Sequence, residues 1–161
     1  MTKLSALFLA ALIGLATSGA ALAAEPMVWP FAEKAPRDPA LGLLQKVDGI
    51  EVSVKDLDAK LIAIEVKATA PRPGYTDLTL VNRPGKLNDR IFAFELRGRP
   101  PQEPSEDEDP TEVTAGGTYK DAPVGEIDVI EVYAEDNCIA YSLAEEKTVE
   151  CTTRVREDET L

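Results

Sequence analysis

Histidine is absent from the 161 residues, and this absence limits the chemistry that the chain can perform. Without an imidazole there is no Ser–His or Cys–His nucleophilic pair and no histidine-ligated zinc, copper or iron. The serines beyond the N-terminal segment are Ser53, Ser105 and Ser142, and none lies in a G-x-S-x-G or S-x-x-K motif. We therefore expect a protein that is not an enzyme and that holds no cofactor.

The two cysteines, Cys138 and Cys151, are spaced so that a β-hairpin would bring them together. If Ala144 and Glu145 form the loop of that hairpin, Leu143 opposes Glu146 and Cys138 opposes Cys151. A four-residue loop would keep the same pairing. Directly opposed residues of antiparallel strands have the Cα separation that a disulfide needs. We predict a disulfide here, which stabilises the fold by about 3 kcal/mol if the chain-entropy description holds.

Residues 99–110 form the one segment of unusual composition, because they combine four prolines with five acidic residues. Glu106, Asp107 and Asp109 are candidate ligands for calcium, which takes six to eight oxygen ligands. The glycine of a typical calcium loop is missing, however, and Pro110 stiffens the chain where the ligands should converge. A solvated acidic loop is the simpler interpretation. A calcium- or cation-responsive protein remains the alternative function.

The only tryptophan, Trp29, lies near Phe31 in a proline-rich segment. Four prolines within residues 24–40 disfavour a helix or a central strand and predict an extended arm. Trp29 and Phe31 then have two possible roles. They either dock on the surface of their own domain or anchor a partner, because buried aromatic residues often carry interface energy.

The N-terminus has the pattern of a cleavable signal peptide over residues 1–23. Lys3 precedes an apolar run from Leu4 to Leu15, and Ala21-Leu22-Ala23 is an A-x-A cleavage site. The apolar run is too short for a good membrane span, so we expect a periplasmic or secreted protein without one. Loss of Lys3 leaves 16 basic against 29 acidic residues, a net charge of −13. A chain this acidic repels nucleic acid and anionic lipid.

Beyond residue 41 the hydrophobic residues alternate with polar ones, which indicates β-strands. Runs of this kind occur near residues 50–55, 62–69, 77–80, 92–97, 126–134, 138–143 and 146–151, and Val113 marks one more short strand. Pro73-Gly74 and Asp136-Asn137 are turn signals between them. The pattern predicts an all-β fold of seven to eight strands over residues 41–155, with a frayed acidic tail at 156–161. It most resembles an antiparallel, immunoglobulin-like sandwich.

The face of the sheet that carries the disulfide stays open at this point. Ile130, Val132 and Tyr141 would share a core-like face, which leaves Cys138 on the outer one. The last strand would then offer Thr148 to the core, which is a poor core residue. A bulge or a slip of one residue would exchange the faces.

Taken together, these patterns predict a non-enzymatic binding or assembly module that acts through protein–protein contacts. The expected partner is another envelope or extracellular protein, recruited by addition of a strand to an exposed sheet edge. Such sandwiches carry many unrelated functions, so this prediction rests on exclusion and on the fold.

Overall fold

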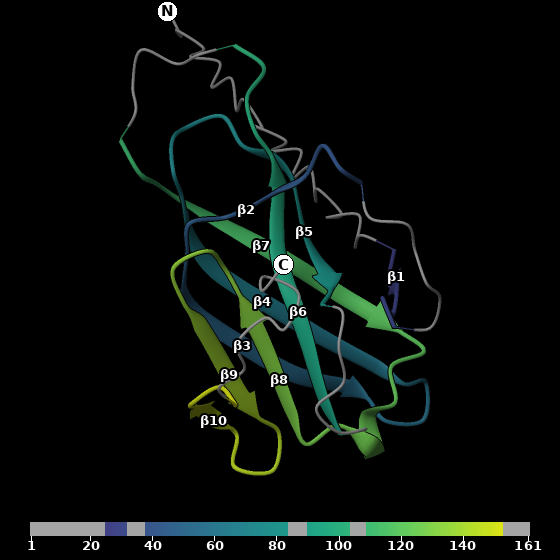
Figure 1. The fold of residues 1–161 in the computed structure, drawn as a ribbon. Helices are drawn as coiled ribbons and strands as arrows, with labels where there is room; N and C mark the ends of the chain where they lie inside the picture. The colour runs from purple at the N-terminus through teal and green to yellow at the C-terminus, as the bar shows by residue number, and fades with distance from the viewer. Residues whose placement is uncertain (1–24, 32–37, 84–89, 104–108, 153–161) are drawn as a thin grey trace, which may run out of the picture.

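The structure is a computed structural model that describes residues 25–31, 38–83, 90–103 and 109–152. These residues form two β-sheets that pack face to face, and the strands of the two sheets cross in the view of Figure 1. Sheet A contains β1 (Met27–Val28), β3 (Lys46–Asp56), β4 (Leu61–Ala70) and β7 (Thr111–Lys120). Sheet B contains β2 (Gly42–Leu43), β5 (Thr76–Asn82), β6 (Ile91–Arg99), β8 (Val129–Tyr133), β9 (Cys138–Ser142) and β10 (Lys147–Val149). The all-β prediction is confirmed, with ten strands in the described residues instead of seven to eight.

The prediction of purely antiparallel sheets is wrong, because the sheets are mixed. Sheet A has the order β1-β7-β4-β3, and its β1–β7 pair is parallel. In sheet B the central strand β6 runs parallel to β8 and antiparallel to β2 and β5. The chain leaves sheet B after β6, crosses sheet A as β7, and returns through the short 3-10 helix η1 (Val124–Glu126) to β8. Strand β7 thus belongs to the long crossover that parallel neighbours require.

The hydrophobic core lies between the two sheets and follows from the alternation in the strands. Sheet A contributes Ile62, Ile64 and Val66 of β4, which are almost fully buried. Sheet B contributes Phe94 of β6 and Ile130 of β8, which are fully buried as well. Alternation therefore predicted the inward face of these strands correctly.

Strand β7 is ten residues long, whereas the sequence indicated only a short strand at Val113. Gly116 and Gly117 interrupt its alternation, which is why the pattern was weak. Gly116 has a φ of +111°, and a Cβ atom there would lie 2.1 Å from the carbonyl oxygen of Ile64. Only glycine fits such a backbone at so close an approach. Gly116 thus lets β7 approach β4 closely, and the two strands pair from Thr111 to Tyr119.

The turns agree with the sequence in part. Gly74 has a φ of +90°, as the predicted Pro73-Gly74 turn requires. The loop between β8 and β9 is not Asp136-Asn137, because the N–H of Ala134 donates to the carbonyl of Asn137 and Tyr133 pairs with Cys138. The predicted register is therefore off by two residues. A shift of two keeps every side chain on its face.

The C-terminal hairpin has the predicted register, since Lys147 pairs with Ser142 and Thr148 pairs with Tyr141. The strands leave four residues in the turn instead of two. Cys138 and Cys151 form the predicted disulfide with their Cα atoms 6.2 Å apart. Neither a slip nor a bulge interrupts β8–β9 or β9–β10.

The disulfide lies on the outer face of sheet B, which settles the question that the sequence left open. Ile139 packs against the core, whereas Cys138 alternates with it and pairs with Tyr133 on the opposite face. Thr148 is exposed on β10, which is a short edge strand of sheet B. A polar residue at this position therefore costs no burial.

Candidate functional site

Strand β3 is an edge of sheet A over most of its eleven residues. Its only strand partner in the described residues is β4. At its start the side chain of Asn137 binds both backbone groups of Val47. From Gly49 onward no such side-chain cap covers the strand in the residues that the structure describes. An uncovered edge is a template for pairing with a further strand.

The second half of β3 also exposes apolar side chains. Val54 is 44% exposed although it pairs with the buried Ile62, and Leu57 in the following turn is 64% exposed. Val52 on the same face is half-buried. We call Val52, Val54 and Leu57 the β3 rim. It continues the core face beyond the point that sheet B covers, so an added strand would find apolar neighbours there.

A groove of about 430 Å³ runs along the outer face of sheet A beside this edge. Glu51, Ser53 and Lys55 of β3 form one side of it. The lining from β4 and β7 consists of Glu65 and of small residues that include Ala63, Thr114, Gly116 and Thr118. Small side chains leave this face hollow. The charged groups of β3 stand at its border, where they are accessible to another chain.

A second polar group of residues lies on the outer face of sheet B, and sequence reasoning missed it. Glu131 is fully buried although it points away from the core. Its Oε2 accepts a hydrogen bond from the Tyr133 hydroxyl at 2.8 Å, and its Oε1 accepts bonds from the backbone N–H and the hydroxyl of Thr152. Glu131 thus fastens the segment that follows Cys151 to the sheet.

Glu95 on the neighbouring strand is buried in the same way. Its Oε2 accepts from Nε and Nη2 of Arg97, both at 2.8 Å. The guanidinium of Arg83 lies 3.8 Å from the ring centroid of Tyr133, close enough for a cation–π contact. From the sequence alone, the alternation within each strand predicts that Glu95 and Glu131 face solvent. The only sequence feature that could have indicated their burial is a hydrogen-bond donor two residues away on the same strand, which is Arg97 for Glu95 and Tyr133 for Glu131.

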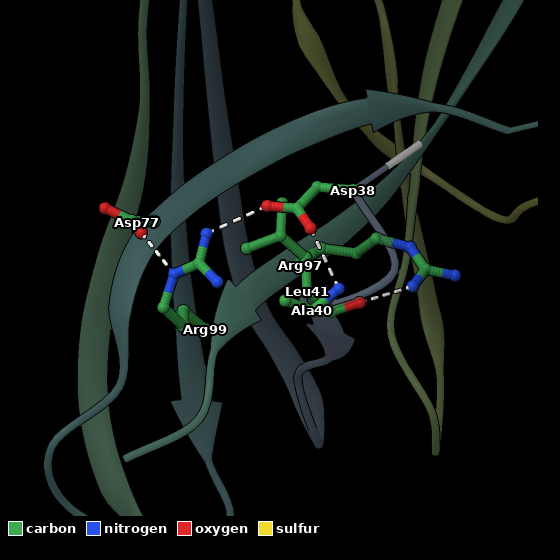
Figure 2. Close-up of polar contacts among 6 residues, drawn as sticks. All are labelled: Asp38, Ala40, Leu41, Asp77, Arg97 and Arg99. Atoms are coloured by element: carbon green, nitrogen blue, oxygen red, sulfur yellow. Dashed lines mark hydrogen bonds and ion pairs between the residues drawn. The ribbon is translucent and has the colours of Figure 1, made fainter. Parts of the chain in front are cut away.

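Arginines of β6 also tie the loops of sheet B together (Figure 2). Arg99 donates to Asp77 at 2.6 Å and to Asp38 at 2.8 Å, and Arg97 donates to the carbonyl of Leu41 at 2.7 Å. The backbone N–H of Ala40 and the Arg99 guanidinium hold the pKa of Asp38 below its ordinary value. These bonds position β2 and β5 against β6. The acids on this face already have donors, so their arrangement is that of a structural network.

Trp29 lies inside the protein, with only 2% of its surface exposed. Its ring packs against those of Phe31, Phe92, Phe94 and Tyr119 at centroid distances of 5.4 to 5.9 Å. Residues 27–28 of the predicted arm pair with β7, which carries Trp29 into the core. Trp29 therefore docks on its own domain, the first of the two alternatives. Phe31 is half-buried beside it, and a role of either residue in partner binding stays a prediction.

The predicted calcium ligands Glu106 and Asp107 lie outside the described residues, as do the signal peptide and the acidic tail. Asp109 lies just before β7. Within the residues that the structure describes, no group of three or more Asp, Glu or Cys side chains could hold a metal ion. In the same residues no helix has the length and apolar character to cross a membrane.

Comparisons of this chain with family models, with curated proteins and with solved structures found no match.

Proposed function

We propose that this protein is an exported, non-enzymatic binding module that recruits an extended segment of another envelope or extracellular protein by strand addition at β3. The observation that carries the proposal is that β3, from Gly49 to Asp56, has no strand partner other than β4 in the described residues. Edge strands usually carry protection such as inward-pointing charges or a covering loop. At the open end of β3, Val54 is the residue on the core-side face, and it is apolar and exposed. An inward-pointing charge therefore does not protect this end of the strand.

The chemistry of the edge indicates what kind of segment fits it. An added strand alternates its side chains between the two faces of sheet A. Apolar side chains on one face would cover the β3 rim, and polar ones on the other would meet Glu51 and Lys55 at the groove. Main-chain hydrogen bonds supply affinity in such complexes, and the alternate side chains supply specificity.

The compartment and the finer fold belong to the same proposal. The Cys138–Cys151 disulfide supports an oxidising compartment such as the periplasm or the extracellular space. The two packed sheets support a sandwich that is a variant of the immunoglobulin type, in which β6 and β8 run parallel. Intact-mass analysis of the native protein should show cleavage after Ala23 or Ala24.

The function is tested by photo-crosslinked capture from the native envelope with the disulfide-bonded protein. Val54→Lys places a charge at the open end of the edge and should abolish capture of the partner. Val28→Lys is the matched control, because Val28 is 52% exposed on β1 at the opposite edge of sheet A. That control should capture the partner as the wild type does. Equal capture by all three proteins, or capture of nothing above background, would count against the proposal.

A further inference from the structure

We infer that the β3 edge, in the absence of the partner segment, accepts the β3 of a second copy, so that two chains pair antiparallel about a two-fold axis at Ser53. This inference rests on the proposed function only in requiring that the β3 edge accepts a strand. It adds a second occupant, which competes with the partner segment for the same edge, and the register in which this occupant pairs. Both follow from the order of side chains along residues 51–55.

The charges along β3 are complementary to themselves in this register. Residues that face each other across the axis have numbers that are symmetric about 53, so Glu51 of one copy faces Lys55 of the other, and the reverse. Both side chains line the groove on the outer face of sheet A. Opposite charges that face each other directly on a sheet stabilise the pair. The dimer has two such pairs, because the axis repeats each contact.

The apolar side chains match in the same register. Val52 of one copy faces Val54 of the other on the opposite side of the sheet. Val54 is 44% exposed in the single chain, and Val52 is half-buried. Pairing would bring the two β3 rims together and remove apolar surface from water. Ser53 faces its own copy at the axis, where a small polar side chain causes no clash.

Other symmetric registers lose this match. Residues that lie directly opposite each other in an antiparallel pair point to the same face of the sheet. Because side chains alternate between the faces along β3, the two-fold axis must pass through a residue and not between two residues. An axis at Val52 leaves Glu51 opposite Ser53, and an axis at Val54 leaves Lys55 opposite Ser53. Axes at Glu51 or Lys55 set like charges against each other, which destabilises a strand pair. The register about Ser53 alone pairs both charges.

In the residues that the structure describes, no second strand pairs with residues 51–55, and four of these five residues are exposed. The Asn137 cap engages Val47, which lies outside the paired residues 51–55. Pairing would join the two sheets A into one continuous sheet, with the two grooves side by side on its outer face. The paired stretch is short compared with a standard interface of about 1,600 Å². The net charge of each chain also opposes association. The dimer is therefore weak and forms at high protein concentration.

Sedimentation analysis of the disulfide-bonded protein over a dilution series, in buffer of physiological salt, tests the inference. The wild type should show a reversible monomer–dimer equilibrium. Glu51→Lys or Lys55→Glu alone replaces both attractive pairs by repulsive ones and should weaken the dimer by about tenfold. An equal mixture of these two variants should restore it. One chain then carries lysine at both positions and the other carries glutamate at both, so each facing pair again joins opposite charges.

Matched variants control for net charge. Glu112→Lys and Lys120→Glu on β7 make the same charge changes at exposed positions that β4 separates from the edge. They should leave the dimer within about twofold of the wild type, since rim-distant surface charges contribute little. Amide hydrogen exchange of residues 51–55 should slow on concentrating the wild type.

A wild type that stays monomeric to its highest soluble concentration would overturn the inference. So would a dimer that the two charge variants do not weaken, or a mixture that fails to restore it. The proposed function fails separately, when Val54→Lys captures partners as well as the wild type does. If the wild type is monomeric and the Val54→Lys variant no longer captures the partner, the dimer is excluded and the proposed function is supported.

Discussion

The side-chain amide of Asn137 binds both backbone groups of Val47, one bond from Val47 N–H to Oδ1 and one from Nδ2 to the Val47 carbonyl, each 2.8 Å long. Asn137 closes the turn before β9 in sheet B, whereas Val47 lies near the start of β3 in sheet A. The amide thus joins the two sheets at one corner of the sandwich. It also fixes where the capped part of β3 ends and the open edge begins.

Replacing Asn137 by alanine should lower the free energy of unfolding by about 2 to 3 kcal/mol. Each lost bond is worth about 1 kcal/mol, and the part-buried backbone groups of Val47 lose their partners. Chemical denaturation measures the change. Asp136→Ala in the same turn is the control, because its exposed side chain should contribute no more than about 0.5 kcal/mol. Equal stability of Asn137→Ala and the wild type would show that the corner is held by packing alone.

Replacing both Cys138 and Cys151 by serine should lower stability by about 3 kcal/mol. The bridge closes the C-terminal hairpin and holds Thr152 next to Glu131. Reduction of the wild type should lower its stability by a similar amount, and the serine variant should not respond to reductant. Titration of the denatured, unreduced protein should find no free thiol. Two free thiols per chain would contradict the bridge.

The disulfide and its register could be predicted because they depend on local geometry alone. Once the turn is placed between Leu143 and Glu146, period-two strands leave one partner for each residue, and Cys151 comes opposite Cys138. The inward faces of β4 and β6 were predictable for the same reason. Each needs only the alternation of the residues in its own strand.

The parallel β6–β8 pair and the burial of Glu131 could not be predicted, because both depend on residues distant in the chain. The order of strands in a sheet is set by how β7 crosses the other sheet, which leaves no signal in β6 or β8. Glu131 is buried by Tyr133 and by Thr152, and the latter lies 21 residues away. The sequence predicted that some sheet edge is exposed, but it did not identify β3 as that edge. The residues of one strand do not show which other strands pair with it.

Replacing Glu131 by alanine should lower stability by about 2 to 3 kcal/mol. The substitution removes the acceptor of the Tyr133 hydroxyl and of both Thr152 donors inside a buried site. Glu131→Gln keeps an acceptor for Thr152 and should cost about half as much. Glu135→Ala, at an exposed position in the next turn, should be neutral. Thermal and chemical unfolding measure all three. A neutral Glu131→Ala would contradict a fastening role for this carboxyl.

The buried hydroxyl of Tyr119 makes the stability of the fold depend on pH in the alkaline range. Tyr119 is only 2% exposed, and burial raises the pKa of its hydroxyl from 10.0 to about 12. The unfolded chain therefore loses the Tyr119 proton near pH 10, while the folded chain keeps it to about pH 12. Between these values the folded state binds more protons, so the free energy of unfolding falls as pH rises. The full effect is roughly 2 to 3 kcal/mol, at about 1.4 kcal/mol per pH unit.

Tyr119→Phe isolates this contribution, because phenylalanine keeps the ring packing against Trp29 and has no proton to lose. Lys46 and Lys147 also have raised pKa values, owing to hydrogen bonds with Asp48 and Glu145, and their contribution falls over the same range in both proteins. The two proteins should lose stability in parallel up to about pH 10, and above it the wild type should lose more stability than Tyr119→Phe does. Denaturation midpoints at stepped pH measure the divergence. Parallel curves to pH 12 would mean that the Tyr119 hydroxyl reaches solvent in the folded protein.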